Sequence, residues 1–183
     1  DRALRPVRRE LQMVFQDPYA SLNPRQRIMG ALTDGPIQKG VPRAQAQARA
    51  RDLLEIVGLG ADAARRFPHE FSGGQRQRIG IARALAMDPD LIIADEAVSA
   101  LDVSIQAQVL DLLRDLRDRL NLSILFITHD LRVAAQLCDR IAVMQKGKLV
   151  EIGTVHDIFL SPRQDYTRQL LAAVPGGGWA HDA

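Results

Sequence analysis

The sequence predicts an α/β fold, in which a parallel sheet carries an inserted and mainly helical subdomain. Three short apolar runs support this prediction, and they occupy residues 11–15, 91–94 and 124–127. Short apolar runs of this kind between turn signals are typical of strands buried on both faces of a parallel sheet, and only Gln12 interrupts the first of them. Helical patterns separate the runs, so strands and helices alternate as they do in α/β proteins.

The stretch between the first two strands, about residues 17–87, is predicted to be mainly helical and to form the inserted subdomain. One helix is expected over residues 44–57, because Pro42 suits a helix start and Gly58 suits the left-handed residue after a helix end. A second helix is expected to begin after Ser72 and to reach about residue 86.

Residues 103–120 carry the clearest helical period of the chain. Charged residues occupy one face of this segment, and an apolar stripe occupies the opposite face. The stripe consists of Ile105, Val109, Leu112, Leu113, Leu116 and Leu120. This pattern predicts an amphipathic helix that packs on the sheet.

Beyond residue 129 the pattern predicts a hairpin that turns at Lys146 and Gly147, then short helices near Asp157 and over residues 164–172. Residues 175–178 are expected to form a flexible tail. The expected division of the chain is a helical subdomain at about 17–87, an α/β core at about 88–153 and a C-terminal extension at about 154–183.

Composition narrows the possible functions. The 183 residues suffice for one domain with a sizeable core, and the net charge of +2 with only 4% aromatic residues does not argue for nucleic acid. The single Cys138 excludes an internal disulfide. No apolar run approaches the ~18 residues that span a bilayer. We therefore expect any attachment to a membrane to depend on a partner.

Polar residues follow each of the three apolar runs. Gln16 follows the first run, Asp95 and Glu96 follow the second, and Thr128 and His129 follow the third. In an open parallel sheet, ligands bind outside the carboxyl ends of the strands. One carboxylate could hold Mg²⁺ or its waters, a second could orient the attacking water, and the other groups could sense a γ-phosphate. Taken singly, each residue could instead be a turn residue, a helix cap or a solvent-facing acid.

A Ser-Gly-Gly-Gln segment precedes the predicted helix at 72–86. Ser72 is a suitable N-cap, and Gly73 and Gly74 leave backbone N–H groups uncovered at the helix start. The helix dipole adds positive potential there, so the segment suits an anion. The alternative is a flexible turn ahead of a helix.

Four segments together resemble the motifs of ATP-binding-cassette (ABC) ATPases, in the order and spacing of that family. MVFQDP at 13–18 is similar to the Q-loop, and FSGGQRQRIGIARAL at 71–85 is similar to the signature motif. LIIADEAVSALD at 91–102 is similar to the Walker B strand and D-loop, and FITHD at 126–130 to the switch-histidine segment. The resemblance implies a P-loop NTPase-type sheet core.

The resemblance also implies roles for the strand-end residues, with ATP and Mg²⁺ as cofactors. Asp95 would hold Mg²⁺ through water, and Gln16 would reach the metal and the attacking water. Glu96 would be the catalytic carboxylate that polarises this water. His129 would contact the γ-phosphate and stabilise the transition state.

In the family, two ATPase subunits bind two nucleotides head to tail. The resemblance therefore implies that Ser72, Gly73, Gly74 and Gln75 belong to the ATP site completed by the opposite subunit. Residues 99–102 would lie along the dimer interface, and Asp102 is counted with the cofactor-binding residues.

The chain departs from the family pattern in one serious respect. It contains no G-x-x-x-x-G-K-[S/T] sequence, which would supply the phosphate cradle, a lysine and a hydroxyl ligand for Mg²⁺. The family places this Walker A loop ahead of the Q-loop, so we expect the chain, which begins at Asp1, to be a fragment that does not hydrolyse ATP alone. Phe71 replaces a leucine and Ala97-Val98 replace Pro-Thr, without loss of a catalytic group.

Two segments narrow the resemblance to importers of peptides, nickel and glutathione. QDPYASLNPR at 16–25 and DEAVSALDVSIQAQVLDLL at 95–113 are similar to that subfamily, and the chain most resembles its "F-type" oligopeptide or dipeptide subunit. The implied partners are a second ATPase subunit, transmembrane permease subunits and, indirectly, a substrate-binding protein. The implied location is the cytoplasmic face of the bacterial inner membrane.

Two alternatives remain open. A DNA-repair-type ABC ATPase shares the signature, but such proteins usually carry a long coiled coil between the Q-loop and the signature, and only a compact stretch separates Gln16 from Ser72 here. A non-catalytic subunit could complete its partner's ATP site. Such a subunit would have no use for Glu96 and His129.

Overall fold

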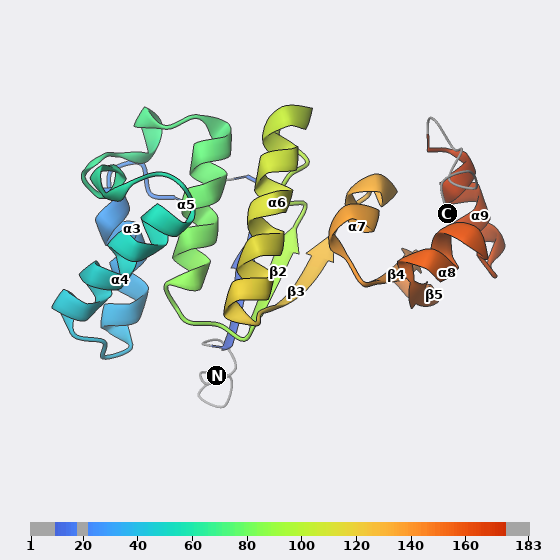
Figure 1. The fold of residues 1–183 in the computed structure, drawn as a ribbon, viewed down its shortest axis with the longest axis horizontal. Helices are drawn as coiled ribbons and strands as arrows, with labels where there is room; N and C mark the ends of the chain where they lie inside the picture. Colours follow the sequence, from blue (N-terminus) through green and yellow to red (C-terminus); the bar gives the residue numbers. More distant parts are fainter. Residues whose placement is uncertain (1–9, 18–21, 175–183) are drawn as a thin grey trace. The chain divides into compact units, whose positions relative to one another are not determined.

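The computed structural model describes residues 10–17 and 22–174, which form parts of two compact units, residues 1–127 and 128–183 (Figure 1). The expected flexible tail at 175–178 lies outside the described residues, as do positions 18–21 of the segment that follows Gln16. None of the described helices is long and apolar enough to cross a bilayer.

A three-stranded parallel sheet forms the centre of the first unit. Its strands are β1 (Leu11–Val14), β2 (Leu91–Asp95) and β3 (Ser123–Ile127), in the order β1-β2-β3. Met13 pairs with Ile93, and Ile93 pairs with Leu125, so all three strands run in register with their carboxyl ends at one edge. The three apolar runs are therefore the strands that the sequence predicted.

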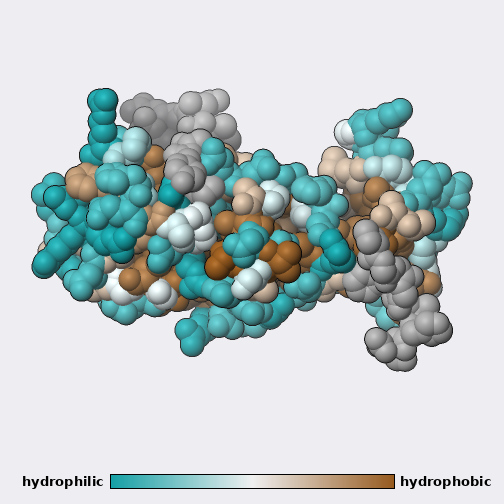
Figure 2. Space-filling model, turned by 90° about the horizontal axis from the view of Figure 1, so that it is seen from above, coloured by the Kyte–Doolittle hydropathy of each residue, from teal (hydrophilic) through white to brown (hydrophobic). Residues whose placement is uncertain are grey.

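Only one face of this sheet is well buried among the described residues. Val14, Ile92 and Ala94 are at most 2% exposed, whereas Leu125 is 52% and Ile127 is 45% exposed. The expectation of burial on both faces is thus wrong for β3, because successive side chains of a strand point to opposite faces and the described helices cover one of them. Hydrophobic atoms reach the surface over the middle of the view in Figure 2.

The segment between β1 and β2 is mainly helical, as predicted. It contains α3 (Ile28–Gln38), α4 (Arg43–Ile56), the 3₁₀ turns η2 (Ala61–Arg65) and η3 (Pro68–Glu70), and α5 (Gly73–Leu85). Gly58 has a φ of 75°, and the Leu59 N–H donates to the Leu54 carbonyl at 2.9 Å. This bond is that of a Schellman end, which confirms Gly58 as the left-handed residue that terminates α4.

Helix α6 (Val103–Leu120) follows β2 and lies beside α5 (Figure 1). Its fully buried residues are Val109, Leu110, Leu113 and Leu116. The predicted stripe is therefore right in its centre and wrong at its end, since Leu120 is 36% exposed in the last turn. Asn121, in the left-handed conformation with a φ of 51°, ends the helix ahead of β3.

The second unit contains α7 (Leu131–Leu137), the antiparallel hairpin β4 (Arg140–Gln145) and β5 (Lys148–Thr154), α8 (Val155–Leu160) and α9 (Asp165–Ala172). The hairpin turns at Lys146 and Gly147, which both have positive φ, as predicted. Its buried centre consists of Ala134, Ile141, Val143 and Ile158. The hairpin, expected in the core range 88–153, thus belongs to the same compact unit as the C-terminal helices.

Glu151 on β5 anchors α9. Its carboxylate accepts hydrogen bonds from the Thr167 hydroxyl at 2.5 Å, the Arg163 N–H at 2.8 Å and the Gln164 N–H at 3.1 Å. These bonds, the Thr167 bond above all, hold the pKa of Glu151 below its ordinary value. The anchor ties the last described helix to the hairpin.

Candidate functional site at the carboxyl edge of the sheet

The carboxyl ends of β1 and β2 bring three predicted residues to one edge. Val14 of β1 pairs with Ala94 of β2. Gln16 and Glu96 each lie two residues beyond this pair, so they occupy equivalent positions after the two strands. Asp95 is the last residue of β2 and is half-buried, like Glu96, whereas Gln16 is exposed. The three residues thus lie at or just beyond the carboxyl ends of two neighbouring parallel strands, and their joint role in a site stays a prediction.

The backbone at Glu96 takes an unusual conformation, and hydrogen bonds hold both its N–H and its carbonyl. Its φ of 46° lies in the left-handed region, which residues with a side chain adopt at a cost. The Glu96 N–H donates to the Ile127 carbonyl at 2.9 Å. The Glu96 carbonyl accepts from the Ser99 N–H and from the Ser99 hydroxyl, both at 3.0 Å. These three bonds hold the strained turn in which the carboxylate stands.

Two side-chain amides connect the segment after β1 to the rest of the site. The Gln16 Nε2 donates to the Ser99 Oγ at 3.2 Å. Gln77, on α5 and only 1% exposed, donates from Nε2 to the Phe15 carbonyl at 3.4 Å. Gln77 was not predicted from the sequence. The available signal was an amide on the helix face that also carries Ile81, Ala84 and Leu85. Buried amides of this kind need a partner, and here the partner is the backbone before Gln16.

Helix α5 begins with a capping box, and the binding of an anion at this helix start stays a prediction. Ser72 and Gln75 form a capping box, in which the Gln75 N–H donates to the Ser72 Oγ at 3.3 Å and the Ser72 N–H donates to the Gln75 Oε1 at 3.0 Å. The N–H groups of Gly73 and Gly74 occupy the first turn, where a helix offers no acceptor of its own. The cap that the sequence predicted at Ser72 is confirmed.

Gly74 also allows a close approach between two helices. A Cβ on Gly74 would lie 2.3 Å from the Cγ2 of Ile105, in the first turn of α6, and a Cβ on Gly73 would lie 3.9 Å from the Leu101 Cδ2. Asp102 caps α6, because its Oδ1 accepts from the Ile105 N–H at 3.0 Å. Residues 99–105 therefore contact Gln16 at one end and the start of α5 at the other.

His129 lies at the beginning of the second unit, two residues beyond β3, and is exposed. Its neighbour Asp130 caps α7 by accepting from the Arg132 N–H at 2.9 Å, and it forms an ion pair with the Arg132 guanidinium at 3.1 Å. The hydrogen bond from the Arg132 side chain is the main reason why the pKa of Asp130 is lowered. Asp130 is thus a helix cap, and the role of the preceding His129 stays a prediction.

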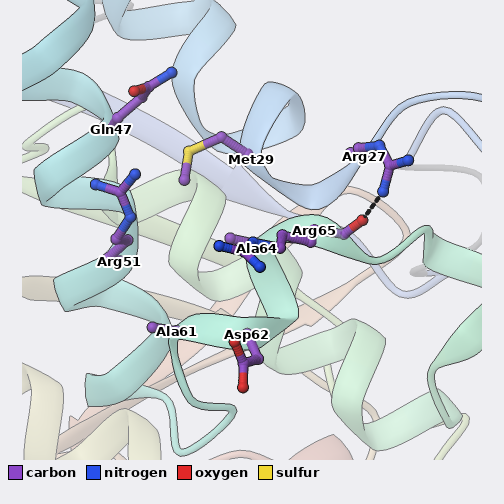
Figure 3. Close-up of a pocket in the computed structure, with 8 residues that line it drawn as sticks. All are labelled: Arg27, Met29, Gln47, Arg51, Ala61, Asp62, Ala64 and Arg65. Carbon is purple, nitrogen blue, oxygen red and sulfur yellow. Dashed lines mark hydrogen bonds between the residues drawn. The ribbon is translucent and has the colours of Figure 1, made fainter.

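A separate hollow of about 450 Å³ opens in the helical part of the first unit (Figure 3). Its lining is rich in arginine, and one of these side chains, Arg27, donates to the Arg65 carbonyl and stacks on the Phe67 ring at 4.6 Å. None of the predicted site residues lines this hollow. The lining residues are Arg27, Met29, Gln47, Arg51, Ala61, Asp62, Ala64 and Arg65.

The donor set at the sheet edge fits a metal ion that takes most of its ligands from elsewhere. Within the described residues no three His, Cys, Asp or Glu side chains gather closely enough to hold a metal by themselves. Asp95 and Gln16 offer oxygen donors at the sheet edge. Mg²⁺ suits such a set, because it commonly binds one or two carboxylates together with water and phosphate oxygens.

Comparison with known proteins gives consistent matches. A family model described as "ABC transporter" matches residues 1–99. A putative peptide import ATP-binding protein of Brucella ovis is 54% identical over 175 residues, which are 95% of this chain and 55% of that protein. The oligopeptide transport ATP-binding protein OppF of Bacillus subtilis is 53% identical over 91% of this chain and 55% of its own length.

A solved structure agrees with the fold. The protein cbiO1 of Clostridium perfringens, part of the ABC transporter complex cbiONQ, matches with a TM-score of 0.79 and 25% identity, over 95% of this chain and 68% of that chain. The chain spans about half the length of the curated relatives that it matches.

Proposed function

Because this chain belongs to the ABC transporter family, we propose that it is part of an ATPase subunit that powers the import of peptides into a bacterial cell. The observation that carries this proposal is the turn after β2, where Glu96 is held in a left-handed conformation by Ser99, whose hydroxyl also accepts from Gln16. Strained backbone conformations cluster at functional sites, where the surrounding contacts maintain them.

Glu96 is proposed as the residue that orients the attacking water and accepts its proton. Its half-buried position at the carboxyl edge of the sheet supports this role. Asp95 and Gln16 would hold Mg²⁺, which neutralises charge on the nucleotide phosphates when bound. His129 would contact the γ-phosphate, a role that rests on its place in the FITHD segment.

The start of α5 is proposed to bind the phosphates of an ATP held by a second, head-to-tail ATPase subunit. The first-turn N–H groups of Gly73 and Gly74, which have no acceptor within the helix, and the positive end of the helix support this role. Ser72 and Gln75 would shape the turn through their capping box. Asp102 and its neighbours at 99–101 would lie along the interface between the two subunits.

The relatives support a proposal about cargo, partners and location. The names of the Brucella ovis and Bacillus subtilis proteins point to peptide cargo and to transport. We therefore propose permease subunits as direct partners and a substrate-binding protein as an indirect one. The subunit would lie at the cytoplasmic face of the membrane, held there by the permease.

The test is ATP hydrolysis by the complete gene product assembled with its partner subunits. Glu96→Gln should lower kcat at least 100-fold, a typical scale for loss of a catalytic proton acceptor, and should leave ATP binding in place. Glu10→Gln, at the opposite edge of the same sheet, is the matched control and should leave kcat unchanged.

If Glu96→Gln leaves hydrolysis intact while Gly74 variants abolish it, the chain serves only its partner's ATP and the catalytic assignment is wrong.

A further inference from the structure

We propose that Ser99 is a positioning residue that couples Gln16 to the backbone of Glu96. The proposal rests on the proposed ATPase function and adds a residue to the same site. Ser99 would act through Glu96 and would not touch the nucleotide of its own site.

The hydroxyl of Ser99 serves two partners at the same time. Its oxygen accepts from the Gln16 Nε2 at 3.2 Å, and its proton goes to the Glu96 carbonyl at 3.0 Å. A hydroxyl has one donor and two acceptor positions, so both bonds can be made together. Gln16 and Ser99 lie 83 positions apart in the chain, and this bond joins the two segments directly.

The Glu96 carbonyl accepts a second hydrogen bond in addition to the one that closes the turn. The Ser99 N–H already closes the turn at 3.0 Å, as any residue at position 99 would. The hydroxyl adds a second donor to the same carbonyl, on a residue with a φ of 46°. Conformations of this kind persist only when several contacts maintain them. The hydroxyl therefore restrains the peptide that carries the carboxylate.

The backbone ahead of Gln16 and the Gln16 side chain are held by different residues. Gln77 is buried and holds the Phe15 carbonyl, whereas the contact between Gln16 and Ser99 is exposed. The backbone before Gln16 is thus fixed to α5, while the Gln16 side chain can leave Ser99 without disturbing the core. When the Gln16 side chain moves away, Ser99 loses its donor and its hydroxyl becomes free to turn from Glu96. The position of Gln16 is transmitted in this way to the catalytic carboxylate.

The kinetic test uses the complete gene product with its partner subunits. Ser99→Ala should lower kcat three- to tenfold and leave the KM for ATP within twofold, and Ser99→Thr, which keeps the hydroxyl, should restore kcat. In a Gln16→Ala background, Ser99→Ala should have no further effect, because the two residues act as one unit. Ser104→Ala, an exposed serine in the first turn of α6, is the control. Independent and additive losses, or a Thr variant as poor as the Ala variant, would overturn the coupling.

A second readout does not depend on ATP hydrolysis. The side-chain amide resonances of Gln16 should shift in the Ser99→Ala protein and keep their wild-type positions in the Ser99→Thr protein. Unchanged resonances in the alanine variant refute the link whatever the protein hydrolyses. Conversely, if the wild-type protein hydrolyses no ATP but the Gln16 resonances still shift in its Ser99→Ala variant, the proposed function is refuted and the link stays intact.

Discussion

Helices α5 and α8 begin with the same capping box, and the surroundings of the two boxes differ. At α5, Ser72 and Gln75 exchange backbone-to-side-chain bonds at 3.3 and 3.0 Å. At α8, Thr154 and Asp157 do the same at 3.1 and 3.3 Å. The N–H groups of the cap residue and of the third helical residue are therefore satisfied equally in both helices.

The difference lies in charge and in the first two helical residues. Asp157 places a carboxylate at the positive end of α8, and the Thr154 hydroxyl, which donates to it at 2.8 Å, is the main cause of its lowered pKa. Gln75 gives α5 the same bonds without a charge, and Gly73 and Gly74 add no side chains. A capping box by itself thus marks only a helix start. At α5 the box carries no charge of its own, which is the condition that the proposed binding of an external anion requires.

The largest effect is expected at Gly74, which has no counterpart in α8. Gly74→Ala places a Cβ 2.3 Å from the Ile105 Cγ2, and overpacking of this kind costs about 1–3 kcal/mol, reduced by the better helix propensity of alanine. Gly80→Ala on the same helix is the matched control, since a Cβ there meets nothing within 4 Å. It should stabilise the protein by up to about 1 kcal/mol. Urea unfolding of the complete protein measures both variants.

Truncation of the neighbouring side chain tests the cause of that loss. Ile105→Ala in the Gly74→Ala background should recover the part of the free energy of unfolding that the clash removed. If Gly74→Ala behaves like Gly80→Ala, the close approach of α5 and α6 is not what position 74 requires.

Removal of the cap hydroxyl should affect both helices. Ser72→Ala should lower the free energy of unfolding by about 1 kcal/mol, the usual value of an N-cap. Thr154→Ala should destabilise α8 at least as much, because the Thr154 hydroxyl also donates to Asp157. Amide hydrogen exchange within each helix resolves the two losses. Equal protection in Ser72→Ala and wild-type protein would mean that packing against Ile105 holds the start of α5 without its cap.

A charge on the neutral box should make α5 resemble α8. Gln75→Glu keeps the capping geometry and should change stability by less than about 1 kcal/mol, while the carboxylate repels phosphate. The apparent affinity of the assembled transporter ATPase for ATP should fall about two- to fivefold, as a charge effect of that size implies. Gln169→Glu, an exposed position on α9, should leave it unchanged. Undiminished affinity in Gln75→Glu would argue against phosphate binding at this helix start.

The smallest effect is a difference in pH dependence. Because the pKa of Asp157 is lowered in the folded protein, its contribution to stability is present above its ordinary value of 3.8 and is lost as the pH falls below that value. The Ser72–Gln75 box contains no titrating group and should not change over this range. Carboxyl carbon NMR of Asp157, with amide exchange at Gln75 as the reference, checks both expectations. A titration midpoint for Asp157 at its ordinary pKa would contradict the first expectation.

Local patterns were sufficient for the strands, the long helix and the cap at Ser72. Each of these depends on side chains that are neighbours in sequence, such as the serine and glutamine three residues apart. The bond between Gln16 and Ser99 depends on strand register and on the shape of a turn 83 positions away, so no local pattern contains it. The same holds for Gln77, whose partner is the backbone carbonyl of Phe15, the residue that follows β1. Helix α3 was not predicted individually, because Gly30, Gly35 and Pro36 weaken its propensity.

At position 96, the residue that best suits the left-handed backbone differs from the residue that the proposed chemistry requires. A glycine would adopt this φ without strain and could gain about 1–2 kcal/mol, but it would remove the carboxylate. A stability-guided redesign of this chain would rank Glu96→Gly among its favourable substitutions and would thereby erase the proposed catalytic group. Thermostabilisation of this protein should therefore hold position 96 fixed and seek its gains at sites such as Gly80.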